Sequence, residues 1–334
     1  MRKYRKLLIS VLLLAIVGAL AFFLYRRTSE PPATAGLLPE GDRLVYVNLK
    51  PIHLLDLTKS SPIHLEGDYR DFIDQTGIHF ERDLDEVAMS RRDTPDGKDV
   101  ESAEILVGHF DAERLKNYLQ KISTATETYR DHTVFSVPNE NHTVRVCILD
   151  GGKVAVTNMV SSGTMHGIID QFHKPSGGPS LLADYYHDVP VTSVAWLIAR
   201  IPDAPDAIQL PGGLSLGFPG SGVAVASLRY NGALLCEADV FAHSESEAKQ
   251  IVDSANSQLT LARSIGQWMG TKGPDKDVKA AFASIQVEQK EKVAVFSATI
   301  PPGVLKKIWS EAQPEVPAIT PSPTPTPKKE RRKR

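Results

Sequence analysis

A serine flanked by glycines is the first candidate for catalytic chemistry. Residues 213–217 read Gly-Leu-Ser-Leu-Gly, which matches the G-x-S-x-G pattern of a nucleophile elbow. That chemistry needs a strand before Ser215 and a helix directly after it, so that the hydroxyl is held on a tight turn. Pro211-Gly212 precedes the motif, and residues 218–222 (FPGSG) cannot form a helix. The pattern therefore predicts a mobile Gly-rich loop.

Ten histidines raise the question of a metal site. His166 and His173 are seven residues apart on one predicted helix, about 10.5 Å along its axis, which is too far to share an ion. His132 and His142 would share one only in a favourable hairpin register. The chain contains no H-E-x-x-H or H-x-x-x-H pair. We therefore assign no catalytic, cofactor-binding or metal-binding residue and expect no cofactor.

The two cysteines are a further pair of reactive groups. Cys147 and Cys236 lie in apolar, strand-like runs in different halves of the chain. Pairing is open to them if the domain is exported, but buried free thiols are the favoured interpretation because free cysteine packs as a small apolar residue.

The apolar segment Leu7–Leu24 indicates where in the cell the protein is located. It is apolar apart from Ser10 and spans about 27 Å as a helix, close to the thickness of a bilayer core. The flank before it holds four basic residues and the flank after it holds two, which favours an N-terminus inside and the bulk of the chain outside.

This segment has two interpretations. A secretory signal cleaved after Ala21 fits the small residues Ala19 and Ala21, but Phe22-Phe23-Leu24 continues the apolar run past that point. We favour an uncleaved anchor, which predicts a single-pass protein of the inner (cytoplasmic) membrane with a periplasmic or otherwise extracytoplasmic body. The alternative is a secreted protein. Both place the folded part outside the cytoplasm.

Charge is segregated along the chain. Residues 28–327 hold 26 basic and 39 acidic side chains, a net charge near −13, whereas both termini are basic. An acidic body argues against nucleic-acid binding by the folded part.

A strand-hairpin-helix pattern recurs in the middle of the chain. Two β-rich segments joined by a turn precede a helix in four places, with hairpins over 86–110, 144–158, 223–242 and 284–300. The third hairpin turns at Asn231-Gly232, a strong two-residue turn signal, and Ser244 with Glu247 makes a capping box for its helix. Asp111 is the predicted cap of the first helix.

The openings of two halves also match, since 44–51 (LVYVNLKP) is similar to 194–202 (VAWLIARIP). We interpret the pattern as an internal duplication and predict an α+β fold, mostly antiparallel sheets covered by helices. The predicted divisions are a basic start and anchor (1–27), a linker (28–36), a first half (37–174), a connection (175–186), a second half (187–312), a Pro-rich linker (313–327) and a basic tail (328–334).

The tail is the second candidate attachment point. Residues 314–327 are proline-rich and predict extended, disordered chain without a core, and Lys328–Arg334 carries six basic residues. Such a tail serves solubility, or it contacts an anionic lipid or polymer by electrostatics.

Three segments carry a resemblance to known proteins. LLPEGDRLVYVNLKP, TGIHFERDLDEVAMS and AEILVGHFDAERLKNYL resemble a group of uncharacterised bacterial membrane-anchored or secreted proteins of acidobacterial type. The likeness covers mainly residues 37–120. His79 departs from it, standing where a small polar or acidic residue is expected. The resemblance implies the same exported, anchored architecture and brings no catalytic residue with it.

Taken together, these features predict a non-enzymatic, membrane-anchored extracytoplasmic protein that binds or scaffolds a partner through its sheet or helix faces. The bilayer is its expected contact through Leu7–Leu24, and the identity of a protein partner is open. The alternative is an exported enzyme or small-ligand-binding protein that uses the loop region 202–222.

Overall fold

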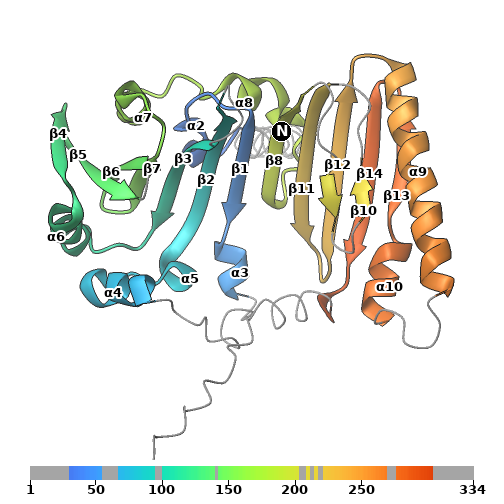
Figure 1. Cartoon of the computed structure of the whole chain (residues 1–334), viewed down its shortest axis with the longest axis horizontal. Coiled ribbons are helices and arrows are strands. Elements are labelled where there is room, and N and C mark those ends of the chain that lie inside the picture. Colours follow the sequence, from blue (N-terminus) through green and yellow to red (C-terminus); the bar gives the residue numbers. More distant parts are fainter. Residues whose placement is uncertain are drawn as a thin grey trace, which may run out of the picture.

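The computed structural model describes residues 30–54, 67–94, 100–139, 142–202, 208–210, 214–216, 221–268 and 276–303. Its centre is a 12-stranded sheet in which every neighbouring pair is antiparallel (Figure 1). The strand order is β13-β14-β12-β11-β8-β1-β2-β3-β7-β6-β5-β4. The predicted α+β class, with a mostly antiparallel sheet covered by helices, is confirmed.

The twelve strands of this sheet span β1 (Arg43–Asn48), β2 (Leu84–Asp93), β3 (Val100–Gly108), β4 (Ala125–Tyr129), β5 (His132–Asn139), β6 (His142–Asp150), β7 (Lys153–Thr157), β8 (Ser193–Ile201), β11 (Gly222–Tyr230), β12 (Leu234–Ala242), β13 (Gln286–Lys290) and β14 (Val293–Ile300). A small second sheet pairs β9 (Ile208–Leu210) with β10 (Leu214–Leu216). The helices are α2 (Ala33–Gly36), α3 (Lys50–Leu54), α4 (Gly67–Thr76), α5 (Phe80–Asp83), α6 (Ala112–Ile122), α7 (Ser162–His173), α8 (Ser180–Tyr185), α9 (Glu245–Trp268) and α10 (Lys276–Ala283), with the 3-10 turn η1 (Tyr186–Asp188) after α8.

The two halves of the chain have corresponding strand orders. From the centre outward, the first half reads β1-β2-β3-β7-β6 and the second reads β8-β11-β12-β14-β13. In each half a helix, α6 or α9, follows the third strand of the series, and the chain then returns beside that strand. The hairpin β4–β5 is an addition to the first half. This correspondence is what the predicted duplication requires.

The halves meet in the antiparallel pair β1–β8, which makes them one continuous sheet. Tyr46 lies opposite Trp196 in this pair, and their rings stack with centroids 5.6 Å apart. Because side chains alternate along a strand, each face of the sheet can be followed from one half into the other.

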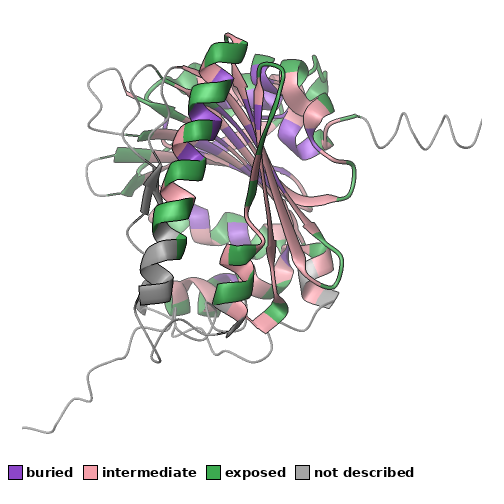
Figure 2. Ribbon diagram, turned by 90° about the vertical axis from the view of Figure 1, so that its right-hand side faces the viewer, coloured by how far each residue is buried: buried purple, intermediate pink, exposed green. Residues whose placement is uncertain are grey.

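Helices cover both faces of the sheet, as Figure 2 shows along its edge. On one face, α2, α7 and α8 bury the larger core, in which Leu44, Ile105, Ile169 and Ile198 are at most 1% exposed. On the other face, α6 covers strands of the first half through Leu115 and Leu119, while α9 and α10 cover the outer strands of the second. We call these the α7 face and the α9 face.

Local signals account for where several elements begin and turn. The Asp111 carboxylate accepts hydrogen bonds from the backbone N–H groups of Glu113 and Arg114 at 3.2 and 3.0 Å, as expected of an N-cap. Gly232 has φ +76° in the β11–β12 turn, a conformation that favours glycine. The amide of Glu247 donates to Ser244 Oγ at 3.2 Å before α9, while its carboxylate accepts from the backbone N–H of His243 rather than of Ser244.

Two segments expected to be connections contribute to the core. The predicted linker 28–36 contains α2, in which Thr34 and Ala35 are buried. The predicted connection 175–186 contains α8, whose Leu181 and Leu182 are buried against β8. Both helices are too short for a clear periodic pattern, and both are ordered by packing on the α7 face.

The cysteines are free, and they lie on opposite faces of the sheet. Cys147 is buried in the core of the α7 face, where burial raises its pKa to about 12. Cys236 is half-buried on the α9 face of β12. Their strands are seven neighbours apart, about 33 Å, so the two thiols cannot form a disulfide without refolding.

Several predictions lie outside the described residues: the anchor Leu7–Leu24, the helix beyond residue 303, the linker 313–327 and the tail Lys328–Arg334. Within the part of the chain that the structure describes, no helix is long and apolar enough to cross a membrane.

Candidate functional site

The α9 face carries an apolar trough at the centre of the sheet. Two rows of side chains, in register across five neighbouring strands, form its floor. They are Val45, Leu197, Ala226, Ala238 and Phe296 in one row, and Val47, Ala195, Leu228, Cys236 and Ala298 in the other. All ten are half-buried rather than buried, and they line a cavity of about 460 Å³. Five strands place the ends of each row about 19 Å apart.

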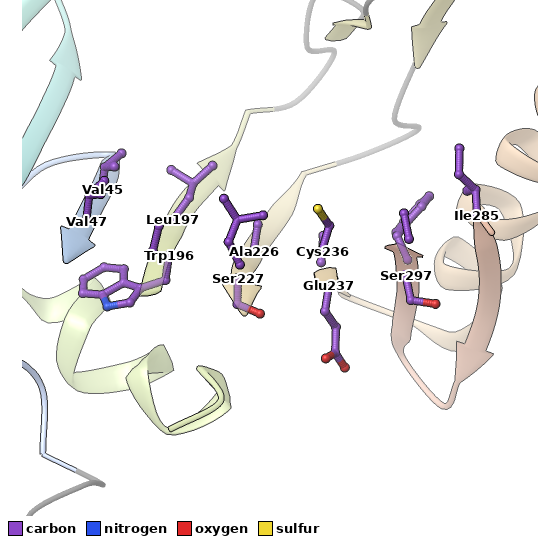
Figure 3. Close-up of a pocket in the computed structure, with 15 residues that line it drawn as sticks. Val45, Val47, Trp196, Leu197, Ala226, Ser227, Cys236, Glu237, Ile285 and Ser297 are labelled. Atoms are coloured by element: carbon purple, nitrogen blue, oxygen red, sulfur yellow. The ribbon is translucent and has the colours of Figure 1, made fainter. Parts of the chain in front are cut away.

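Because side chains alternate along each strand, the polar residues next to the floor residues point to the opposite face of the sheet. In Figure 3, Leu197, Ala226, Cys236 and Ile285 project to one side, while Trp196, Ser227, Glu237 and Ser297 project to the other. The backbone N–H and C=O groups of the floor are paired within the sheet ladders. The trough therefore offers a ligand apolar surface and almost no hydrogen-bonding group.

Helices lie on the α9 face to either side of the trough, outside the residues that line it. α9 packs on β12, β13 and β14, α10 packs on β14, and α6 covers β5 and β6 on the far side. The hairpin β9–β10 contacts α9 and is drawn in front of β12 in Figure 1. The central strands β1, β8 and β11 lie between these helices. At one end of these strands, Ile201 of β8 and Ala224 of β11 pack against the core cluster that includes Ile251 and Val252 of α9.

Cys236 is the one nucleophilic group on the described floor. Burial raises the pKa of its thiol above the ordinary value, so the thiol is protonated at neutral pH. A protonated thiol is a poor nucleophile, and the neighbouring floor residues in the described chain include no base to activate it. The floor is suited to binding rather than to catalysis.

A carboxylate lies beyond one end of the trough. The first row continues from Val45 through Met89 to Glu104 on β3. Burial raises the pKa of Glu104, and the charge of Arg91 opposes that shift without cancelling it. The ionised carboxylate therefore costs folding free energy at neutral pH.

The substitution Glu104→Gln is expected to stabilise the fold at pH 7. Between its unfolded pKa and its raised folded pKa, Glu104 binds more protons in the native state, so its contribution to stability falls as pH rises. The gain from glutamine should thus be largest above the folded pKa and vanish below about pH 4. Urea unfolding of both proteins from pH 3 to 8 measures the difference. An equal difference at every pH would contradict the assignment.

A second cavity, of about 570 Å³, lies beside the loop region 202–222. Its lining combines apolar side chains with two ion pairs: Arg43 pairs with Asp93 at 2.5 Å, and Arg200 lies 3.5 Å from Asp42. Pro202, Ser221 and Gly222 border it, together with His243. Pro202, Ser221 and Gly222 belong to the loop region on which the alternative function predicted from the sequence depends.

The Oγ of Ser221 and the Nε2 of His243 are 3.0 Å apart in this second cavity. A serine-histidine contact at this distance is the first half of a nucleophile-base pair. Triad chemistry also needs a carboxylate on the other imidazole nitrogen, and no hydrogen bond to His243 Nδ1 from a described residue accompanies the contact. The pair fits a hydrogen bond that positions the start of β11.

Ser215, the serine of the G-x-S-x-G pattern, lies in a short strand. Ser215 is the middle residue of the three-residue strand β10, paired with Gln209 of β9, and the next element that the structure describes is β11. A nucleophile elbow holds its serine on a tight turn between a strand and a helix, whereas Ser215 is paired within a strand. The predicted Gly-rich loop was wrong for residues 214–216, which form one strand of the small sheet.

The structure separates the histidines considered as pairs. His142 pairs in register with Asn139 at one end of β5, while His132 is at the other end. His132 instead meets His173, a contact between residues 41 positions apart that sequence spacing did not indicate. His166 stacks on Tyr129, with ring centroids 3.9 Å apart. In the described residues, no group of three or more His, Cys, Asp or Glu is arranged to hold a metal ion.

Comparison with known proteins gives distant similarities only. No protein-family model matches the chain, and no curated protein sequence matches it. Among solved structures, crystal forms III, IV and I of TP0453 are similar over 83% of this chain and 98%, 96% and 96% of theirs. Each is 12% identical in sequence, with TM-scores of 0.43, 0.43 and 0.42. At these scores the similarity carries no argument about function.

Proposed function

We propose that the protein is a non-enzymatic, membrane-anchored extracytoplasmic binding protein, and that the apolar trough holds the apolar part of its ligand. The observation that supports the proposal is the trough itself. A sheet face of ten apolar or thiol side chains between flanking helices is unusual surface for a soluble domain, and exposed apolar patches of this kind mark binding sites.

The composition of the trough favours a small apolar molecule over a peptide strand. Its volume of about 460 Å³ lies in the range of small-ligand sites. An extended peptide would bring backbone N–H and C=O groups against a floor that cannot pair with them, at a cost of about 1–3 kcal/mol for each buried group. A hydrocarbon chain has no such groups and loses nothing by desolvation of polar atoms.

The small floor residues set the depth of the site. Ala195, Ala226, Ala238 and Ala298 carry only a methyl group, whereas Phe296 on β14 is the largest side chain of the floor. A chain lying across the strands would contact the methyl groups along its length. Burial of apolar area contributes about 25 cal/mol for each Å², so a ligand burying about 200 Å² of its own surface gains about 5 kcal/mol before entropy costs.

The experiment is binding of a fluorescent alkyl-chain probe to the intact chain in detergent below the concentration at which micelles form. We expect saturable binding to the wild-type protein and at least about a tenfold loss of affinity in Ala226→Trp, because an indole would fill the middle of the trough. Val191→Trp is the matched control, since Val191 is 56% exposed and is not part of the trough.

Two outcomes would contradict the proposal. One is probe binding that does not saturate. The other is equal affinity of the Ala226→Trp and Val191→Trp variants when both have the circular dichroism of the wild type. If Ser221→Ala loses probe binding and Ala226→Trp does not, the ligand binds in the second cavity and not in the trough. That result would favour the alternative function.

A further inference from the structure

Two histidines from distant parts of the chain meet at the end of α7. His132 lies at the start of β5, and His173 is the last residue of α7. Their Nε2 atoms are 3.2 Å apart, and the rings are tilted by 53° with centroids 5.1 Å apart. The two nitrogen atoms face each other although the residues share no strand pairing or helix.

The distance between the two nitrogens matches that of two ligands on one metal ion. Zinc-nitrogen bonds are about 2.0–2.1 Å long, so two imidazoles on a tetrahedral ion lie about 3.3–3.4 Å apart. At right angles, as in square-planar or octahedral coordination, the distance is about 2.9 Å. The observed 3.2 Å lies between these values. We propose that His132 and His173 form a binding site for a divalent transition metal ion of the imidazole-preferring class.

Contacts of the His132 ring hold it in the orientation that ligation needs. Its Nδ1 is 3.3 Å from the backbone carbonyl oxygen of Ile148. A hydrogen bond from Nδ1 to that carbonyl leaves Nε2 unprotonated, which is the usual arrangement of a metal-bound histidine. Phe172 packs edge-on against both imidazoles, with centroids 5.8 Å from each.

The surroundings favour a cation at this position. His173 ends a 12-residue helix, and the carbonyl groups at a helix C-terminus favour positive charge. Lys153, which lies over the Phe172 ring, is ion-paired with Asp150 at 2.9 Å, so its charge is partly compensated. His173 is exposed, which lets water complete the coordination sphere.

The donor set decides which ions fit. Two imidazoles suit Zn²⁺, Ni²⁺ and Cu²⁺, with Cu²⁺ the tightest, and do not suit Mg²⁺ or Ca²⁺, which require oxygen ligands. Because two protein ligands are fewer than a structural zinc site has, the ion would exchange with solvent.

A bound ion would link the hairpin β4–β5 to α7. Val134 of the hairpin is buried in one core with α7, and nearer the surface the contact is made by polar pairs: Arg130 with Asp170 at 2.7 Å, Tyr129 with Asp170 at 3.2 Å, and His166 with Glu127 at 2.9 Å. Metal binding should therefore slow the opening of this hairpin, which is at the edge of the sheet.

The test is titration of the intact chain with ZnCl₂ at pH 7.5 by calorimetry. We expect the His173→Gln variant to bind zinc at this site at least about tenfold more weakly than the wild type. At zinc concentrations that saturate only the wild-type site, the wild type therefore binds one ion more than the variant. Glutamine keeps a hydrogen-bond donor for His132 but removes the imidazole, so it separates metal ligation from a hydrogen bond between the rings. The matched control is His187→Gln, whose exposed imidazole is outside the pair.

A second measurement uses backbone hydrogen exchange of residues 125–139. Zn²⁺ should slow exchange there in the wild type and in His187→Gln, and should have no effect in His132→Gln or His173→Gln. The proposal is overturned if the wild type and His173→Gln have the same zinc stoichiometry and affinity, or if exchange of this hairpin is insensitive to zinc.

Discussion

Replacing Trp196 by alanine is expected to lower the free energy of unfolding by about 3–5 kcal/mol. Trp196 is 3% exposed on β8, where it stacks on Tyr46 of β1 and meets Tyr186 edge-on at 5.7 Å. These contacts lie where the two halves join, so the cavity would open in the pair β1–β8. Surrounding strands cannot collapse into it without breaking their ladder hydrogen bonds.

Urea unfolding followed by circular dichroism measures this loss. Trp196→Phe is the control, with an expected loss of about 1–2 kcal/mol, because an aromatic ring still contacts Tyr46. The indole N–H of Trp196 has no hydrogen-bond partner among the described residues, so phenylalanine removes no bond. Similar losses in both variants would contradict the argument from ring packing.

The second large effect is expected at Phe135, on the hairpin that extends the first half. Phe135 is 1% exposed and packs with Leu115 and Leu119 of α6 on the α9 face. Phe135→Ala is expected to lower the free energy of unfolding by about 3–5 kcal/mol, because a cavity would replace the largest fully buried side chain of the core beneath α6.

Thr126→Ala is the matched control for this hairpin. Thr126 is exposed on β4 and lies opposite Phe135 in the register. Its replacement should change the free energy of unfolding by less than about 1 kcal/mol, the whole span of strand propensities. Differential scanning calorimetry of the two variants compares them directly. Equal shifts of the melting temperature would show that α6 does not depend on Phe135.

Elements with strong local signals were predicted accurately. Asn231-Gly232 placed the β11–β12 turn, where Gly232 has φ +76°, and Asp111 capped α6. Each of these depends on a preference of a few neighbouring residues, for a left-handed backbone or for a side-chain acceptor. The sequence alone contains that information.

The hairpin β4–β5 was missed because its signals are weak. β4 is the polar edge segment ATETY, and its turn places Arg130 at φ +51°, where glycine or asparagine would normally mark the position. Only Val134 and Phe135 in β5 indicate burial, and they do so through contacts with α7 and α6 that lie far away in the sequence.

The candidate site was missed for a different reason. Residues such as Ala226 and Leu228 alternate with Ser227 in the same way as residues of a covered sheet face. Strand periodicity shows which side chains share a face, but it does not show whether a helix covers that face. The sequence predicted an apolar face, whereas the position of α6 and α9 on either side of it is a property of the whole fold.

The meeting of β1 and β8 at the centre of the sheet has a consequence for folding during synthesis. Val45 and Leu197 are partners in this pair, yet about 150 residues separate them in the chain. At about 5–20 residues per second, a ribosome would finish β1 about 8–30 s before its neighbour. During that interval the first half has an unpaired apolar edge strand, which is the state most exposed to wrong association. Burial of β1 in the sheet interior therefore waits for synthesis of the second half of the chain.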